Sequence, residues 1–175
     1  MKQLIALSVI AASFLLLSCQ KDVKQKEIES NNNNLVQAAK VNMEKDRPFK
    51  GSYTTTSEIL QPAPILKTRI TGTGNVSQLG KSTFVALSTL NFTTQPPFTL
   101  AGTATFTAAN GDEVYTSFTG TSTPTAQGML DVSMTHIITG GTGRFQNATG
   151  SFVGHTIAFP GHSEGYIEHE GVIRY

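Results

Sequence analysis

From Gly51 onward the chain consists of short segments in which apolar and polar residues alternate, with turn residues between them. Residues 128–138 are the clearest case, because Leu130 and Val132 fall on one face while Asp131 and Ser133 fall on the other. A period of two is typical of a β-strand that buries one face. Threonine, which favours strands, and glycine recur throughout this part of the chain. The sequence therefore predicts an all-β domain.

Glycine, proline and asparagine divide this domain into eight segments. We place the segments at residues 49–58, 65–77, 82–92, 98–108, 112–121, 128–139, 149–159 and 164–175. Asn110-Gly111 is the sharpest turn signal, because this dipeptide favours a tight turn between antiparallel strands. The spacing predicts an eight-stranded antiparallel up-and-down β-barrel, since closure removes unpaired edges. A β-sandwich is the alternative. Segment 82–92 is apolar on both faces, which predicts packing against more than one layer.

The most specific string in the domain is glycine-rich and runs from Ile138 to Phe145. Its structural residues are Gly140, Gly141, Gly143, Arg144 and Phe145. Glycine permits positive φ and close backbone approach, so we expect a compact loop between the sixth and seventh strands. Phe145 would then act as a plug that packs this loop against the end of the barrel.

This string, Ile-Thr-Gly-Gly-Thr-Gly-Arg-Phe, resembles the Gly-Gly-Thr-Gly-x-Phe signature of the allene oxide cyclase and dirigent superfamily. Residues 110–115 are similar to the preceding hairpin of bacterial members, and residues 157–160 and 171–173 to the closing strands of allene oxide cyclases. The resemblance implies an eight-stranded barrel, often a trimer, that isomerises a small apolar molecule or steers radical coupling in its mouth. Allene oxide cyclases carry a glutamate on their first strand, whereas here the first carboxylate is Glu58, at the end of that strand. No catalytic residue of the family is therefore carried over.

Cys19 is the only cysteine of the chain, and it ends the run Leu16-Leu17-Ser18-Cys19. Lys2 and the apolar stretch that follows it have the form of a secretory signal peptide. The arrangement is typical of the lipobox of bacterial lipoproteins, and it predicts that Cys19 is lipidated; an ordinary secretory signal is the alternative. Several acyl chains such as palmitate anchor a protein stably. Gln20, in place of an aspartate, favours the outer membrane of a Gram-negative bacterium.

Three parts are therefore expected: a lipoprotein signal peptide (residues 1–18), a lipidated flexible linker (19–47) and the β-barrel domain (48–175). The linker is rich in charged residues and asparagine, and such a composition buries too little apolar surface to fold. The chain carries 13 Lys plus Arg and 12 Asp plus Glu, a balance that argues against nucleic acid as a partner. The lipid bilayer, reached through Cys19, is the first partner expected, and self-association as a trimer or dimer is a further prediction.

Four residues are candidates for acid–base chemistry: His136, His155, Glu168 and Glu170. Each histidine shares a strand face with apolar residues, so it would line the barrel interior as a general base or as a hydrogen-bonded structural histidine. The two glutamates lie two residues apart and share one face, where they would be catalytic if inward and solvated if outward. No zinc-ligand spacing is present, and we predict no metal and no cofactor.

These features predict a membrane-anchored lipoprotein of the cell envelope whose small barrel binds a small apolar ligand or an envelope partner. One alternative is a cofactor-independent isomerase or cyclase acting in the barrel mouth. Another is a structural subunit that self-associates through its threonine-rich outer face. Polar groups converging on an open cavity would favour the enzyme, whereas an interior filled by large apolar side chains would favour the structural subunit.

Overall fold

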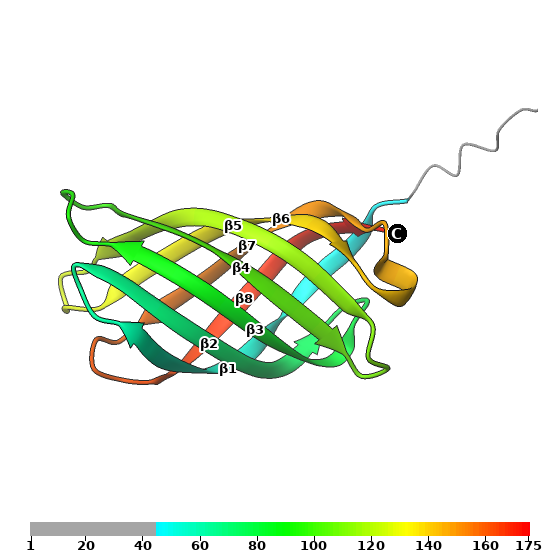
Figure 1. The fold of residues 1–175 in the computed structure, drawn as a ribbon, viewed down its shortest axis with the longest axis horizontal. Helices are drawn as coiled ribbons and strands as arrows, with labels where there is room; N and C mark the ends of the chain where they lie inside the picture. The colour runs from blue at the N-terminus through cyan, green and yellow to red at the C-terminus, as the bar shows by residue number, and fades with distance from the viewer. Residues whose placement is uncertain (1–44) are drawn as a thin grey trace, which may run out of the picture. The chain divides into compact units, whose positions relative to one another are not determined.

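Residues 45–175 are described by the computed structural model, and they form a closed barrel of eight antiparallel strands (Figure 1). The strands are β1 (Arg47–Gln61), β2 (Ile65–Val76), β3 (Gly80–Asn91), β4 (Phe98–Ala108), β5 (Glu113–Pro124), β6 (Leu130–Gly141), β7 (Thr149–Ala158) and β8 (Glu164–Arg174). Each strand pairs with its neighbours in sequence, and β8 pairs with β1 to close the ring. The predicted up-and-down barrel is confirmed. Cys19, the signal peptide and most of the linker lie outside the described residues.

Apart from the strands, the described part of the chain contains one short 3-10 helix, η1 (Gly143–Phe145), between β6 and β7. Among residues 45–175 there is no helix with the length and apolar character needed to cross a membrane.

The barrel interior is filled by inward-facing side chains, and aromatic rings form its centre. Phe49, Tyr53, Phe84, Phe106 and Phe152 are each at most 4 % exposed. Phe49 stacks on Phe152 with 4.2 Å between ring centroids, and Phe106 lies within 6 Å of Phe49, Phe84 and Phe152. Full burial of each such side chain stabilises the fold by roughly 1.5–3 kcal/mol. The interior is therefore a packed hydrophobic core that joins all eight strands.

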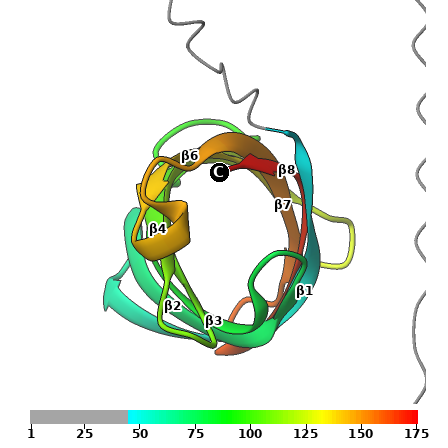
Figure 2. The ribbon, with the colours of Figure 1, turned by 90° about the vertical axis from the view of Figure 1, so that its right-hand side faces the viewer.

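The glycine-rich loop after β6 lies on the rim of the barrel that faces the viewer in Figure 2, and we call this end, where Phe145 of the loop is buried, the closed end. Phe145 is fully buried there, and its ring lies edge-on against the ring of Tyr175, 4.7 Å away. Phe145 N–H donates to the carbonyl of Thr142, and Ala148 N–H donates to the carbonyl of Phe145. Phe145 therefore packs the loop against the core at this end of the barrel.

The conformational reason for two of the loop glycines differs. Gly143 adopts φ = 53°, a positive value that glycine reaches without steric cost because it has no Cβ atom. Gly141, by contrast, has no positive φ; a Cβ atom there would lie 2.0 Å from the carbonyl oxygen of Glu113. Of the two properties for which glycine was expected in this loop, Gly141 therefore uses close backbone approach and not positive φ, because β5 lies too near for any side chain.

The outer face of β3 departs from the expectation of a second packing layer. Phe84 and Ala86 point into the core, whereas Val85 and Leu87 point outward and are 47 % and 49 % exposed. No part of residues 45–175 covers them. The strand is therefore apolar on both faces although only one face is buried; the other apolar face is exposed to solvent.

Candidate functional site

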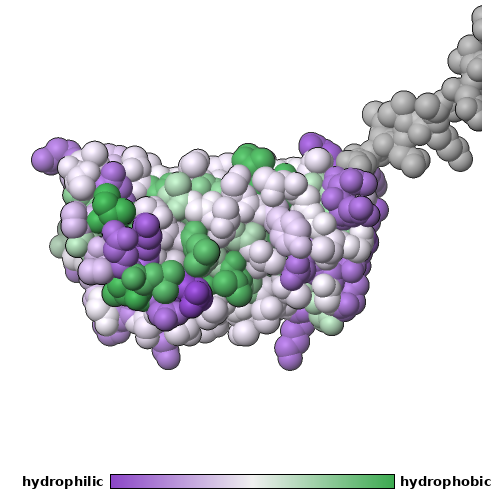
Figure 3. Space-filling view, viewed as in Figure 1, coloured by the Kyte–Doolittle hydropathy of each residue, from purple (hydrophilic) through white to green (hydrophobic). Residues whose placement is uncertain are grey.

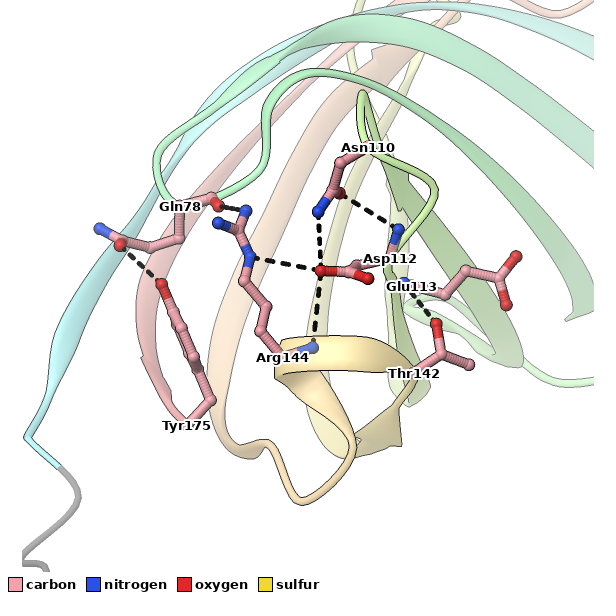
Figure 4. A network of polar contacts seen from close by, with 7 residues as sticks. All are labelled: Gln78, Asn110, Asp112, Glu113, Thr142, Arg144 and Tyr175. Carbon is pink, nitrogen blue, oxygen red and sulfur yellow. Dashed lines mark hydrogen bonds and ion pairs between the residues drawn. The ribbon is translucent and has the colours of Figure 1, made fainter.

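The glycine-rich loop also anchors a polar network that ties together three turns at the closed end (Figure 4). The guanidinium of Arg144 donates to the backbone carbonyl of Gln78 and lies 3.7 Å from the carboxylate of Asp112. The Tyr175 hydroxyl donates to the side-chain oxygen of Gln78 over 3.0 Å. Thr142 accepts a hydrogen bond from the backbone N–H of Glu113. These contacts link the three turns and the C-terminal Tyr175, so the network holds the turns together at this end.

Two histidines occupy the barrel interior. His136 on β6 and His169 on β8 are each 2 % exposed, and their ring centroids lie 5.5 Å apart. The His136 ring stacks on Phe152 at 4.6 Å with an interplanar angle of 11°, and Phe118 lies 4.8 Å away on another side. Aromatic rings therefore enclose both imidazoles.

The interior imidazoles have few polar partners. His136 Nδ1 lies 3.1 Å from the hydroxyl of Thr116, while His136 Nε2 and His169 Nδ1 have no hydrogen-bond partner among residues 45–175. Burial lowers the pKa of His136 to about 3, and the neighbouring His169 imidazole adds to the effect. Burial likewise lowers the pKa of His169 to about 4. Both rings are neutral at neutral pH, and bases this weak, walled in by rings, are poorly suited to accept a proton from a substrate.

The other three candidates lie together on the outside of the barrel. His155 on β7 pairs in register with Glu168 on β8, and Glu170 follows two residues later on the same outward face. The glutamates are therefore solvated, which is the outward alternative given above. His155 shares a face with Val153 and Ile157 as expected, but that face points away from the core. An interior position for His155 is thus wrong.

A groove runs along this outer surface of β1, β7 and β8, and we call it the β7–β8 groove. It consists of two adjoining hollows of about 600 Å³ and about 560 Å³. Both hollows are lined by His155, Tyr166 and Glu168. Tyr166 and Phe159 are about half exposed, at 52 % and 50 %. The groove thus combines exposed aromatic rings with charged side chains.

Charged groups surround the groove, and several are already paired. His155 Nε2 lies 2.8 Å from the Asp131 carboxylate, and Lys50 Nζ lies 3.0 Å from the Glu170 carboxylate. Glu164 and Glu168, which flank Tyr166 on the outward face of β8, form no ion pair with another described residue. Two acidic groups beside an exposed aromatic ring are therefore available to a partner. No group of three or more His, Cys, Asp or Glu side chains within residues 45–175 is placed to hold a metal ion.

Two residues that contact the candidate histidines were not identified from the sequence. His169 lies inside the barrel, and its position two residues from Ile167 on an alternating strand was a usable signal for this. Asp131, the partner of His155, gave no such signal. Their contact depends on the register of β6 against β7, in which Asp131 pairs with Ile157, and the sequence does not show this register.

Comparisons with family models, with curated proteins and with solved structures found no match, so none of them identifies this chain as a member of the allene oxide cyclase and dirigent superfamily.

Proposed function

We propose that this chain is a non-enzymatic binding domain, tethered by a lipidated Cys19 to the outer membrane of a Gram-negative bacterium. The leader sequence supports the anchor, and the glycine-rich loop at the closed end of an eight-stranded barrel supports kinship with the allene oxide cyclase and dirigent barrels. Cys19→Ala should move the full chain from the membrane fraction to the soluble periplasmic fraction. Persistence of this variant in membranes would contradict lipid anchoring.

By the criterion given above, the filled interior argues against an enzyme and favours a structural subunit, so the observation that carries the binding role is the open groove on the outer wall. The rings of the core occupy the space in which a small apolar ligand would lie, so ligand uptake would require their displacement. The β7–β8 groove instead presents Tyr166 and Phe159 to solvent with charged groups around them. Exposed aromatic residues with a polar surround are typical of protein contact sites.

The partner that fits the groove is an extended segment of another envelope protein that carries a basic side chain. A lysine or arginine placed over the Tyr166 ring would gain a cation–π contact and lie beside Glu164 and Glu168. Lys50 would not compete strongly for these groups, because it already pairs with Glu170. The barrel ring is closed, so the partner must bind through side chains rather than by adding a strand to a sheet edge.

The isomerase or cyclase alternative gains no support from this geometry. His136 is enclosed by rings, and His155, Glu168 and Glu170 lie on the outer wall rather than in the barrel mouth. A small apolar ligand stays a second candidate, which native mass spectrometry of the purified full chain would detect. A molecule that co-purifies with the folded barrel in stoichiometric amounts would favour it over the protein partner.

Photo-crosslinking in cells tests the groove directly. A photoreactive amino acid placed at Tyr166 should give a discrete adduct with another envelope protein, and the charge reversals Glu164→Lys and Glu168→Lys should abolish that adduct. The same amino acid at Thr93, on the exposed turn between β3 and β4, is the control. An adduct that survives both reversals, or that forms equally from Thr93, would contradict binding in the groove.

A further inference from the structure

The four turns at the end of the barrel opposite the closed end form a surface that we call the apolar rim. It consists of residues 62–64, 92–97, 125–129 and 159–163, which join β1 to β2, β3 to β4, β5 to β6 and β7 to β8. All four turns meet at one end because neighbouring strands are antiparallel around the whole ring (Figure 1). None of these residues is Lys, Arg, Asp or Glu, and five of the chain's seven prolines are among them.

Large apolar side chains are exposed at this end. Ile59 and Leu60, just before the first of the four turns, are 66 % and 46 % exposed, and Phe159 in the last turn is 50 % exposed. All five prolines of the apolar rim are exposed as well. In Figure 3 most of the strongly green residues of the visible face lie in its left-hand half, toward the rim.

The closed end is built in the opposite way. Its turns carry the charged side chains of Asp112 and Arg144, which lie 3.7 Å apart. Their apolar residues Leu79, Phe145 and Ala148 point inward and are 4 %, 0 % and 2 % exposed. Turns of this barrel can therefore bury their apolar residues, and the topology does not force those of the apolar rim to be exposed. Clustered exposed apolar residues mark a contact with a partner or a membrane.

We propose that the apolar rim inserts into the interfacial region of the bilayer to which Cys19 anchors the chain. The barrel then stands on the membrane with its closed end pointing away. This inference rests on the lipid anchor of the proposed function. It also places the β7–β8 groove, whose second hollow reaches Phe159, directly above the membrane surface.

The chemistry of the apolar rim suits a bilayer. Its turns are separate protrusions, to which a fluid bilayer adapts, whereas a rigid protein would need a matching hollow for each. Proline has no backbone N–H, so these turns bring few unpaired donors into an apolar phase. The basic residues beside the rim are Lys67 and Arg69, and Arg69 already pairs with Glu58 over 3.0 Å. No basic cluster is available there for anionic headgroups, so we expect neutral phospholipid to be sufficient.

The length of the tether allows this orientation. Residues 20–44 join Cys19 to the described chain, which enters β1 at the closed end, where the Arg47 guanidinium lies 4.6 Å from the ring centroid of Tyr175. A strand of 12 residues such as β2 is about 40 Å long, whereas a segment the length of the tether spans up to roughly 85 Å. A few apolar side chains bind a membrane weakly, but an anchor on the same chain makes their insertion intramolecular.

Fluorescence quenching of the full chain in vesicles of neutral phosphatidylcholine tests the orientation. Ala63 in the apolar rim and Ala109 in a turn of the closed end are both exposed, so Ala63→Cys and Ala109→Cys place a fluorophore at opposite ends. Cys19 is the only natural cysteine, so a lipidated chain takes up one label, and a second label reveals a free Cys19 thiol. Phospholipid with brominated acyl chains should reduce the emission of the Ala63→Cys label at least twofold and leave that of the Ala109→Cys label unchanged.

Two leucines supply a matched pair of variants. Leu60 beside the apolar rim and Leu87 on the outer wall of β3 have almost the same exposure, 46 % and 49 %. In the Ala63→Cys chain, Leu60→Glu should abolish quenching, whereas Leu87→Glu should not change it. Leu60 does not line the β7–β8 groove, so this result is independent of groove binding. Circular dichroism checks that both variants are folded, and Ile59→Glu replaces Leu60→Glu if that variant does not fold.

The possible failures separate the rim from the anchor. A chain that floats with the vesicles without quenching of the Ala63→Cys label, or with equal quenching at both ends, would overturn insertion of the apolar rim and leave the anchor standing. An equal loss of quenching in Leu60→Glu and Leu87→Glu would also overturn it. A chain that takes up two labels yet floats, and loses flotation in Leu60→Glu, would support the rim and contradict the anchor. A chain that does not float would contradict both.

Discussion

His136 and His155 lie on neighbouring strands, yet the barrel wall between them gives the two side chains opposite environments. His136 faces a core of aromatic rings and is 2 % exposed, whereas the side chain of His155 is 51 % exposed and pairs with Asp131 in the groove. The interior side chains must together fill a limited space, whereas the outer side chains face solvent. Inner substitutions should therefore change folding, and outer substitutions should change contacts while leaving folding almost intact.

A fall in pH should have the largest effect on stability, because it acts on the two histidines inside the barrel. The folded-state pKa values of His136 and His169, about 3 and about 4, lie below the value of about 6.5 in an unfolded chain. Below pH 6.5 the unfolded chain therefore binds more protons than the barrel, and stability is lost as the pH falls toward these folded-state values. Between pH 7.5 and pH 5 the two groups together should cost about 4 kcal/mol of unfolding free energy.

Urea unfolding at the two pH values measures this loss. The double variant His136→Leu/His169→Leu is the control, because it removes both imidazoles while carboxylates continue to titrate. Its pH dependence should be much smaller than that of the wild-type barrel, and each single variant should fall between the two. Equal pH dependence in the wild type and the double variant would show that the interior imidazoles do not limit acid stability.

Close backbone contact at the closed end should produce the next largest effect. In Gly141→Val, the new Cβ would lie 2.0 Å from the carbonyl oxygen of Glu113 and 2.9 Å from Cβ of Phe145. Neither neighbour can move without disturbing the strand pairing or the buried plug, so we expect a loss of about 3 kcal/mol. Thermal unfolding provides the measurement.

Gly161→Ala separates this steric effect from backbone strain. Gly161 has φ = 87° and open space around the position of a Cβ atom, so only conformational strain of about 1 kcal/mol is expected. If both variants lose the same amount of stability, close approach is not the reason for glycine at position 141.

Alternation predicted the fold well because each strand of a barrel buries one face only. On β6 the predicted row of Leu130, Val132, Met134, His136 and Ile138 is the row that faces the core. Turn residues then fixed the strand limits, since every connection between strands is short. Closure followed from the number of strands, because an open sheet of eight would leave two unpaired edges.

The same reasoning assigned His155 to the wrong face for a physical reason. The outward face of β7 carries Val153 and Ile157, whereas its inward face includes Gly154, where a Cβ atom would lie 3.1 Å from Met134 and 3.2 Å from His169. Small residues are required inside because side chains from β6 and β8 fill that space. Local hydrophobicity therefore points to the outer face of β7, and only the packing from neighbouring strands corrects it. The groove, which depends on strand register, was equally hidden from the sequence.

Loss of the polar network at the closed end should have a moderate effect. Arg144→Ala removes the donor to the Gln78 carbonyl and the charge beside Asp112 (Figure 4). A charge-assisted hydrogen bond that holds two turns together contributes about 1–2 kcal/mol. Lys50→Ala, which breaks the exposed pair with Glu170 in the groove, is the matched control and should cost no more than about 0.5 kcal/mol. Equal losses in thermal unfolding would mean that the network adds no more than an ordinary surface ion pair.

The smallest expected change in stability belongs to His155→Ala. The ring is half exposed and its contact with Asp131 lies on the outer wall, so unfolding free energy should change by no more than about 0.5 kcal/mol. The adduct formed from the photoreactive residue at Tyr166 should nevertheless decrease, because His155 lines both hollows of the groove. His136→Ala should show the reverse pattern, with a large loss of stability and, at a temperature where the barrel is still folded, an unchanged adduct. A His155→Ala chain that unfolds as readily as His136→Ala would remove the distinction between the two sides of the wall.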